Sequence, residues 1–144
     1  MSAISQTPAN VAQLTTSGIS NVITNGYAAA GVTIVAGNMV SLADASAQTY
    51  SLADADVSGV KIPAGMALGG AGPGQPFFIQ TRGTINPGSV SMTSGSMIYL
   101  AVTSGGITET YADIGSGFWS VPLGQALTNG SLYLNLTGQA VAKP

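Results

Sequence analysis

Residues 96–103 read SMIYLAVT, a run in which side chains alternate between two faces. Ile98 and Leu100 fall on one face, whereas Met97 and Tyr99 fall on the other. An alternation with a period of two residues indicates a β-strand that is buried on one side. This stretch therefore predicts a strand, and the same pattern returns elsewhere in the chain.

Short apolar runs of this kind recur about every ten residues from residue 31 onward. They are separated by Gly-Gly, Asn-Gly and Pro-Gly pairs, which are typical of turns. No amphipathic helical pattern is evident in this region. The spacing predicts an all-β fold, a compact β-barrel or sandwich.

An internal repeat becomes visible when this region is laid over itself. The run GNMVSLA from Gly37 matches GSMIYLA from Gly95, and GMAL from Gly65 matches GQAL from Gly124. A third block, beginning at Phe77, overlays the block that begins at Leu132. Three blocks in the same order predict a barrel domain over residues 31–144, made of two similar lobes, 31–86 and 87–142. The alternative is coincidence among Gly-rich strands.

The first 30 residues differ from the rest, because they are mostly Ser, Thr, Asn, Gln and Ala with isolated apolar residues. We interpret residues 1–30 as an extended N-terminal arm that could add a strand to a neighbouring subunit. A disordered terminus is the alternative interpretation. The candidate contact residues of the arm are its spaced apolar side chains: Ile4, Val11, Leu14, Ile19, Val22 and Ile23.

Two further candidate contact residues, Phe118 and Trp119, follow the turn sequence Gly-Ser-Gly at 115–117. A large aromatic pair in this position can fill a core. It can also anchor an interface, because aromatic residues are enriched at the centres of protein interfaces. Both interpretations remain open at this point.

Charge is scarce, with three Lys and Arg against five Asp and Glu in 144 residues and a net charge of −2. Average domains carry about 25% charged residues, whereas this chain carries 6%. No Lys or Arg precedes Lys61, so the sequence argues against binding to nucleic acid by phosphate neutralisation. The chain has no Cys and no His, which excludes disulfides, cysteine-ligated zinc and histidine as a general base.

Other motifs carry little chemistry. The segment DADVSG at 54–59 opens like a calcium loop, but Gly65 stands at the twelfth position, where such a loop has Glu, so we interpret it as an acidic turn. The apolar run at 27–37 is too short to span a bilayer, and the N-terminus lacks the features of a signal peptide. We therefore expect no metal, no cofactor, no membrane partner and no enzymatic activity.

The ordered runs AGNMVSLA, YSLAD, PAGMAL, GQPFFIQTRGTI, SGSMIYLAVTSGGIT and LGQAL resemble the small capsid decoration, or cement, proteins of tailed bacteriophages. The likeness covers residues 35–136 and leaves the first 30 residues outside. It implies a compact β-rich protein, made in the host cytoplasm, that binds the outside of an expanded phage head. It also implies a homotrimer that clamps neighbouring major capsid subunits, with no catalytic residues.

Two other classes remain as alternatives. One is a virion fibre or tail-associated adhesin that binds host glycans, and the other is a small extracellular β-sandwich binding module. An adhesin should expose an aromatic platform beside polar side chains, whereas a cement protein needs only broad contact with the capsid.

Overall fold

The computed structural model shows that nearly all regular structure in the described residues is β-strand, which confirms the all-β prediction. One 3-10 helix, η1 (Pro8–Asn10), precedes the first strand. Within the part of the chain that the structure describes, no helix has the length and apolar character needed to cross a membrane. The described residues are 4–13, 21–55, 62–88, 92–111, 114–127, 130–136 and 140–143.

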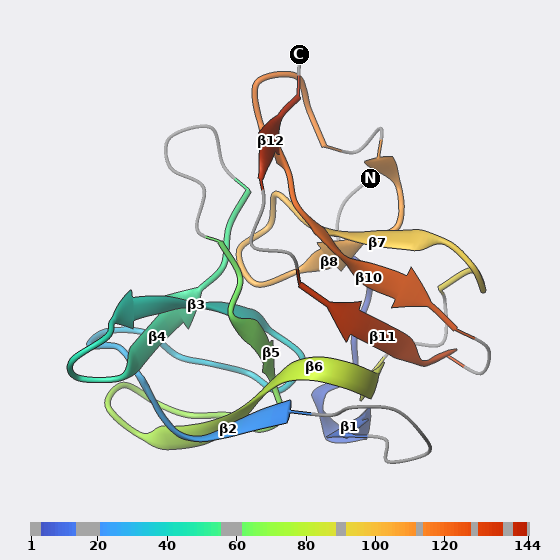
Figure 1. The fold of residues 1–144 in the computed structure, drawn as a ribbon. Helices are drawn as coiled ribbons and strands as arrows, with labels where there is room; N and C mark the ends of the chain where they lie inside the picture. The colour runs from blue at the N-terminus through green and yellow to red at the C-terminus, as the bar shows by residue number, and fades with distance from the viewer. Residues whose placement is uncertain are drawn as a thin grey trace.

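Ten strands form one sheet, in which the order is β2-β4-β3-β5-β6-β11-β10-β7-β8 and β1 pairs with β6 (Figure 1). A second, two-stranded sheet joins β9 and β12. The strands of the large sheet are β1 (Val11–Gln13), β2 (Asn21–Ala28), β3 (Met39–Asp44), β4 (Thr49–Leu52), β5 (Gly65–Ala67), β6 (Pro76–Pro87), β7 (Met97–Leu100), β8 (Ile107–Thr108), β10 (Pro122–Ala126) and β11 (Leu132–Asn135). Those of the small sheet are β9 (Trp119–Ser120) and β12 (Val141–Ala142).

Strand β2 closes a five-stranded ring, because it pairs with β6 as well as with β4. The ring runs β2-β4-β3-β5-β6 and returns to β2, so the strands inside it have partners on both sides and present no free edge. It encloses a core made mainly of branched and aromatic side chains: Ala28, Ile34, Val40, Tyr50, Ala67, Ala71, Phe77 and Ile79.

The strand pairing repeats along the chain. Strand β3 pairs with β4 and β5, and β5 pairs with β6; in the same way β7 pairs with β8 and β10, and β10 pairs with β11. The register repeats too, since Val40 opposes Gly65 and Ile98 opposes Gly124. We name β2, β3, β4, β5 and the start of β6 the first unit, and the end of β6 with β7, β8, β10 and β11 the second unit.

The turns before β3 and β7 also correspond. Gly37 has a φ of 93° and Gly95 a φ of 90°, a conformation that favours glycine. The N–H of Gly37 donates to the carbonyl of Ala67 at 2.8 Å, and the N–H of Gly95 donates to the carbonyl of Ala126 at 2.8 Å. Gly37 and Gly95 thus make corresponding backbone hydrogen bonds in the two units.

In the structure, the third block aligns in a different register from the one that the sequence repeat predicts. Ala67 opposes Ile79, whereas its counterpart Ala126 opposes Leu132, so Leu132 corresponds to Ile79 and not to Phe77. The difference is two residues. A shift of two residues leaves every side chain on the same face of a strand, so the alternation of apolar residues could not detect it.

Strand β6 serves both units, so the expected boundary between residues 86 and 87 does not separate them. Ile79 in its first part opposes Ile23 of β2. Its counterpart Leu132 opposes Ile85, which lies in the second part of β6. The end of β6 therefore has the same position in the second unit that β2 has in the first.

The described part of residues 1–30 belongs to the sheet and is not a separate arm. Strand β2 lies in the ring, and Val11 of β1 opposes Pro87 of β6. The N–H of Ile4 donates to the carbonyl of Ile107 at 2.7 Å, so residues 4–13 link β8 to the end of β6. Of the spaced apolar residues that suggested contact with a neighbour, Ile4, Val11 and Ile23 pack within the same chain.

A larger core joins the two units. Met39 and Met66 of the first unit contribute to it from the outer face of their ring, and the inner face of the second unit packs on them. The N-terminal segment adds Ile4. The members of this core are Ile4, Met39, Ala53, Ala55, Met66, Ile85, Met92, Ile98, Leu100, Ile107, Val121, Leu123, Ala126, Leu132 and Leu134.

The burial of Ile4 gives a stability prediction. Because Ile4 is only 8% exposed, replacing it with alanine removes buried methyl groups and should lower the free energy of unfolding by about 2–4 kcal/mol. Ser5→Ala is the matched control, since Ser5 is exposed, and it should change stability little. Urea unfolding of the two variants checks this, and equal stability of Ile4→Ala and wild type would restore the interpretation of a free arm.

Two corresponding glycines sit where neighbouring strands approach very closely. A Cβ atom on Gly65 would overlap the carbonyl oxygen of Gln80, and one on Gly124 would overlap the carbonyl oxygen of Tyr133. Both contacts are with backbone atoms of the opposing strand, which cannot rotate away.

Gly65→Ala and Gly124→Ala should therefore each destabilise the protein by about 1–3 kcal/mol, the usual cost of overpacking. Gly69→Ala is the control, because a Cβ atom there has no neighbour within 4 Å. Thermal unfolding measures the three variants, and a Gly124→Ala protein as stable as the Gly69→Ala protein would contradict the close approach.

Candidate functional site

The predicted contact residues near the N-terminus mostly contact the interior of their own chain. Ile4 is buried, and Val11 is half-buried against the larger core. In β2, Val22 is half-buried and Ile23 packs against the core of the first unit. The two other residues of this group, Leu14 and Ile19, lie outside the described residues.

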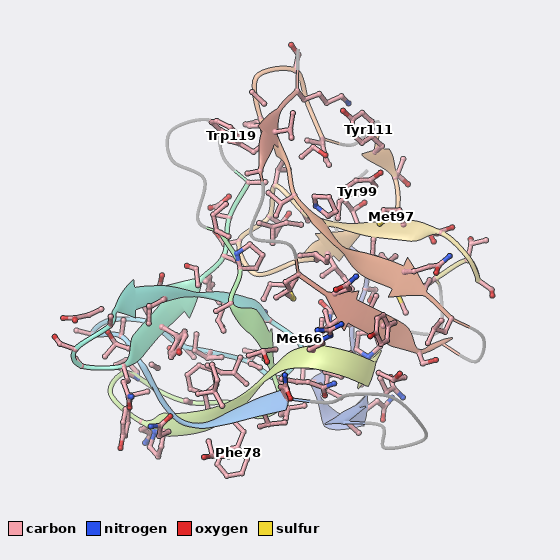
Figure 2. All side chains as sticks on the ribbon, in the orientation of Figure 1. Met66, Phe78, Met97, Tyr99, Tyr111 and Trp119 are labelled. Carbon is pink, nitrogen blue, oxygen red and sulfur yellow. The ribbon has the colours of Figure 1, made fainter. Side chains whose placement is uncertain are left out.

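The aromatic pair Phe118 and Trp119 is half-buried. Trp119 packs against the larger core, and its backbone N–H donates to the carbonyl of Ala55 at 3.2 Å. Figure 2 shows Trp119 at the opposite end of the molecule from β2. The structure therefore does not bring the aromatic pair together with Val22 and Ile23 into one surface.

Lys143 hydrogen-bonds to the loop before β9. The ammonium group of Lys143 donates to the carbonyls of Ile114 at 2.5 Å and Tyr111 at 3.0 Å. It also lies 4.5 Å from the centre of the Tyr111 ring, a cation–π distance. Tyr111 in turn meets Tyr99 edge to face, with ring centres 5.4 Å apart. Lys143 thus holds the aromatic rings on this side of the second unit in place.

Several large apolar side chains remain exposed on the described surface, and none of them is among the predicted contact residues. In Figure 2, Phe78 points away from the ribbon at the bottom of the view, and Met97 lies at the edge of the second unit. The exposed residues are Tyr27, Val35, Leu42, Ile62, Phe78, Met97, Tyr111 and Val141.

One of these residues, Met97, lines a groove of about 430 Å³ on the outer face of the second unit. Its lining combines apolar side chains with two amides and includes no charged residue, so it suits an uncharged ligand or protein surface. The groove lies over strands β7, β10 and β11. Its lining residues are Met97, Pro122, Gly124, Gln125, Tyr133 and Asn135.

A second hollow, of about 620 Å³, surrounds Leu42 on the first unit. It too is uncharged, and its lining residues are Ser41, Leu42, Ala43, Ser51, Ile62, Pro63 and Ala64. Asp44, the last residue of β3, follows the lining residue Ala43 in the chain. The hydroxyl of Ser46 donates a hydrogen bond to the carboxylate of Asp44, and this bond is the largest cause of the lowered pKa of Asp44. The backbone N–H groups of Ala47 and Ser46 also donate to the carboxylate and lower its pKa further. Asp44 is therefore a stable negative charge beside Leu42.

The sequence contained a partial signal for the groove. The alternation in residues 96–103 placed Met97 and Tyr99 on the face opposite Ile98 and Leu100. The alternation does not indicate which face the rest of the chain covers, so it assigns no role to Met97.

The described residues contain no group of three or more acidic side chains that could hold a metal ion. Comparison of the chain with protein-family models, with curated proteins and with solved structures gives no match.

Proposed function

We propose that this protein is a capsid decoration, or cement, protein of a tailed bacteriophage. It binds the outer surface of the expanded head and clamps neighbouring major capsid subunits. It is made in the host cytoplasm, acts as a homotrimer on the virion surface, and has a structural rather than an enzymatic role.

The observation that carries the proposal is the character of the exposed surface. Two uncharged hollows and several exposed apolar side chains lie on a chain that has only eight charged residues. Such surfaces are typical of proteins that work while covered by a partner. Together with the sequence resemblance, this supports a protein whose task is contact.

One observation supports the adhesin as a second candidate. In the groove of the second unit, the half-buried ring of Tyr133 lies among the lining residues with Gln125 and Asn135. Amide side chains both donate and accept hydrogen bonds, as a sugar ligand requires. A virion fibre or tail-associated adhesin that binds host glycans would use this groove.

The cement function predicts that the protein protects heads against heat. A ligand that binds only the assembled lattice stabilises it by about 2.7 kcal/mol per site at a hundredfold excess over Kd. Heads that lack the protein should release DNA at a lower temperature, and added purified protein should restore the wild-type temperature. A dye that reports free DNA during heating measures this.

Heat-unfolded protein, cooled and added in the same amount, is the control and should give no protection. Equal release temperatures with and without bound native protein would reject the cement function. Binding of the protein to one host glycan, without an effect on heads, would establish the adhesin instead.

Phe78 is the aromatic side chain with the largest exposed fraction among the described residues, 54%. Exposed aromatic residues often contribute strongly to binding, so Phe78→Ser should weaken retention on heads by about 1–2 kcal/mol while leaving stability unchanged. Asn25→Ser, an exposed polar change on the neighbouring strand β2, is the matched control. Co-sedimentation of each variant with heads checks this, and retention equal to wild type would exclude Phe78 from the contact.

A further inference from the structure

The groove of the second unit has a counterpart in the first unit that is covered. The repeated strand register assigns a first-unit residue to each lining position, so that Met97 corresponds to Met39 and Gln125 to Met66. Met39 is 0% exposed, whereas Met97 is 47% exposed. The other counterparts are Pro63, Gly65, Gln80 and Arg82, of which Gly65 and Gln80 are buried, Pro63 is buried at the border of the hollow in the first unit, and Arg82 is exposed.

The second unit itself covers this counterpart surface. The backbone N–H of Met39 donates to the carbonyl of Gly105, in the turn between β7 and β8, at 2.8 Å. Leu100, at the end of β7 just before that turn, lies in the same core as Met39 and Met66 and is 0% exposed. The internal interface thus has a receiving face around Met39 and an inserting end made of Leu100 and the turn that follows it.

Within the residues that the structure describes, both parts of this interface occur a second time without a partner. The receiving face recurs as the groove around Met97. The inserting end recurs at Leu42, which corresponds to Leu100 and is 50% exposed, followed by the exposed end of β3 and the exposed turn at 45–48. One free part lies on the second unit and the other on the first, so a single chain cannot satisfy both.

We propose that the groove around Met97 binds a second copy of this chain, whose Leu42 and following turn insert into it. The contact repeats between chains the packing that joins the two units within a chain. This inference rests on the self-association included in the proposed function, but it requires no capsid.

The chemistry of the two surfaces agrees with this pairing. The groove lining contains no charged residue and Leu42 is apolar, so burying Leu42 in the groove is not opposed by desolvation of charge. The charges beside them are opposite in sign: Arg82 opposes the groove residue Asn135, and Asp44 lies two residues beyond Leu42. Because the contact joins two different surfaces, it is head to tail and produces a closed ring or a filament. A homotrimer is a ring of three such contacts.

Two substitutions on the two different surfaces test the proposal. Met97→Asp should disable the groove, and Leu42→Asp should disable the inserting end, so each variant alone should be monomeric by sedimentation or light scattering. An equimolar mixture should form a dimer, because the intact Leu42 of one variant can still bind the intact Met97 groove of the other. Phe78→Asp, an equally exposed change elsewhere, should keep the wild-type mass.

Thermal unfolding of the monomeric variants verifies that they are folded, since both substituted side chains are exposed within one chain. A wild-type mass for Met97→Asp, or a mixture that stays monomeric, would overturn the head-to-tail contact. A monomeric wild type at high micromolar concentration would also overturn it, and heads protected by that monomer would leave the cement function standing. Loss of glycan binding in Met97→Asp, with no change of mass, would assign the groove to a sugar.

Discussion

Strand β6 is the element on which the rest of the structure depends, because it supplies one strand to each unit. Its first part closes the five-stranded ring through β2, and its second part pairs with β11 and β1. The two units therefore share one continuous strand. This shared strand is what allows the inner face of the second unit to pack on Met39 and Met66.

Much of the fold could be predicted from local pattern. The strands followed from period-two alternation, and the matched glycines at 37 and 95 and at 65 and 124 have similar surroundings, because a positive φ or a close backbone approach restricts those positions to glycine. The third block was displaced by two residues. Its one glycine with a positive φ, Gly83, corresponds to Leu136 in the strand register, so no pair of glycines marks the register, and alternation alone is satisfied by any even shift.

The candidate contact residues were harder to predict, because sequence shows that a residue is apolar but not what covers it. Ile4 and Ile23 have the spacing expected of an arm, yet their partners are Ile107 and Ile79 of the same chain. Met97 is the opposite case, an apolar residue of a strand that stays exposed. Like its counterpart Met39 it begins a strand two residues after a glycine with a positive φ, yet Met39 is 0% exposed and Met97 is 47% exposed.

The contact between Ile4 and Ile107 also determines the order in which the molecule can be completed during synthesis. The ring of the first unit needs nothing beyond β6, so it can close while the rest of the chain is still being made. Ile4 leaves the ribosome well before Ile107, and contacts between distant residues form slowly. Strand β1 can pair once β6 is made, but Ile4 stays without this partner, accessible to chaperones and proteases, until β8 is present.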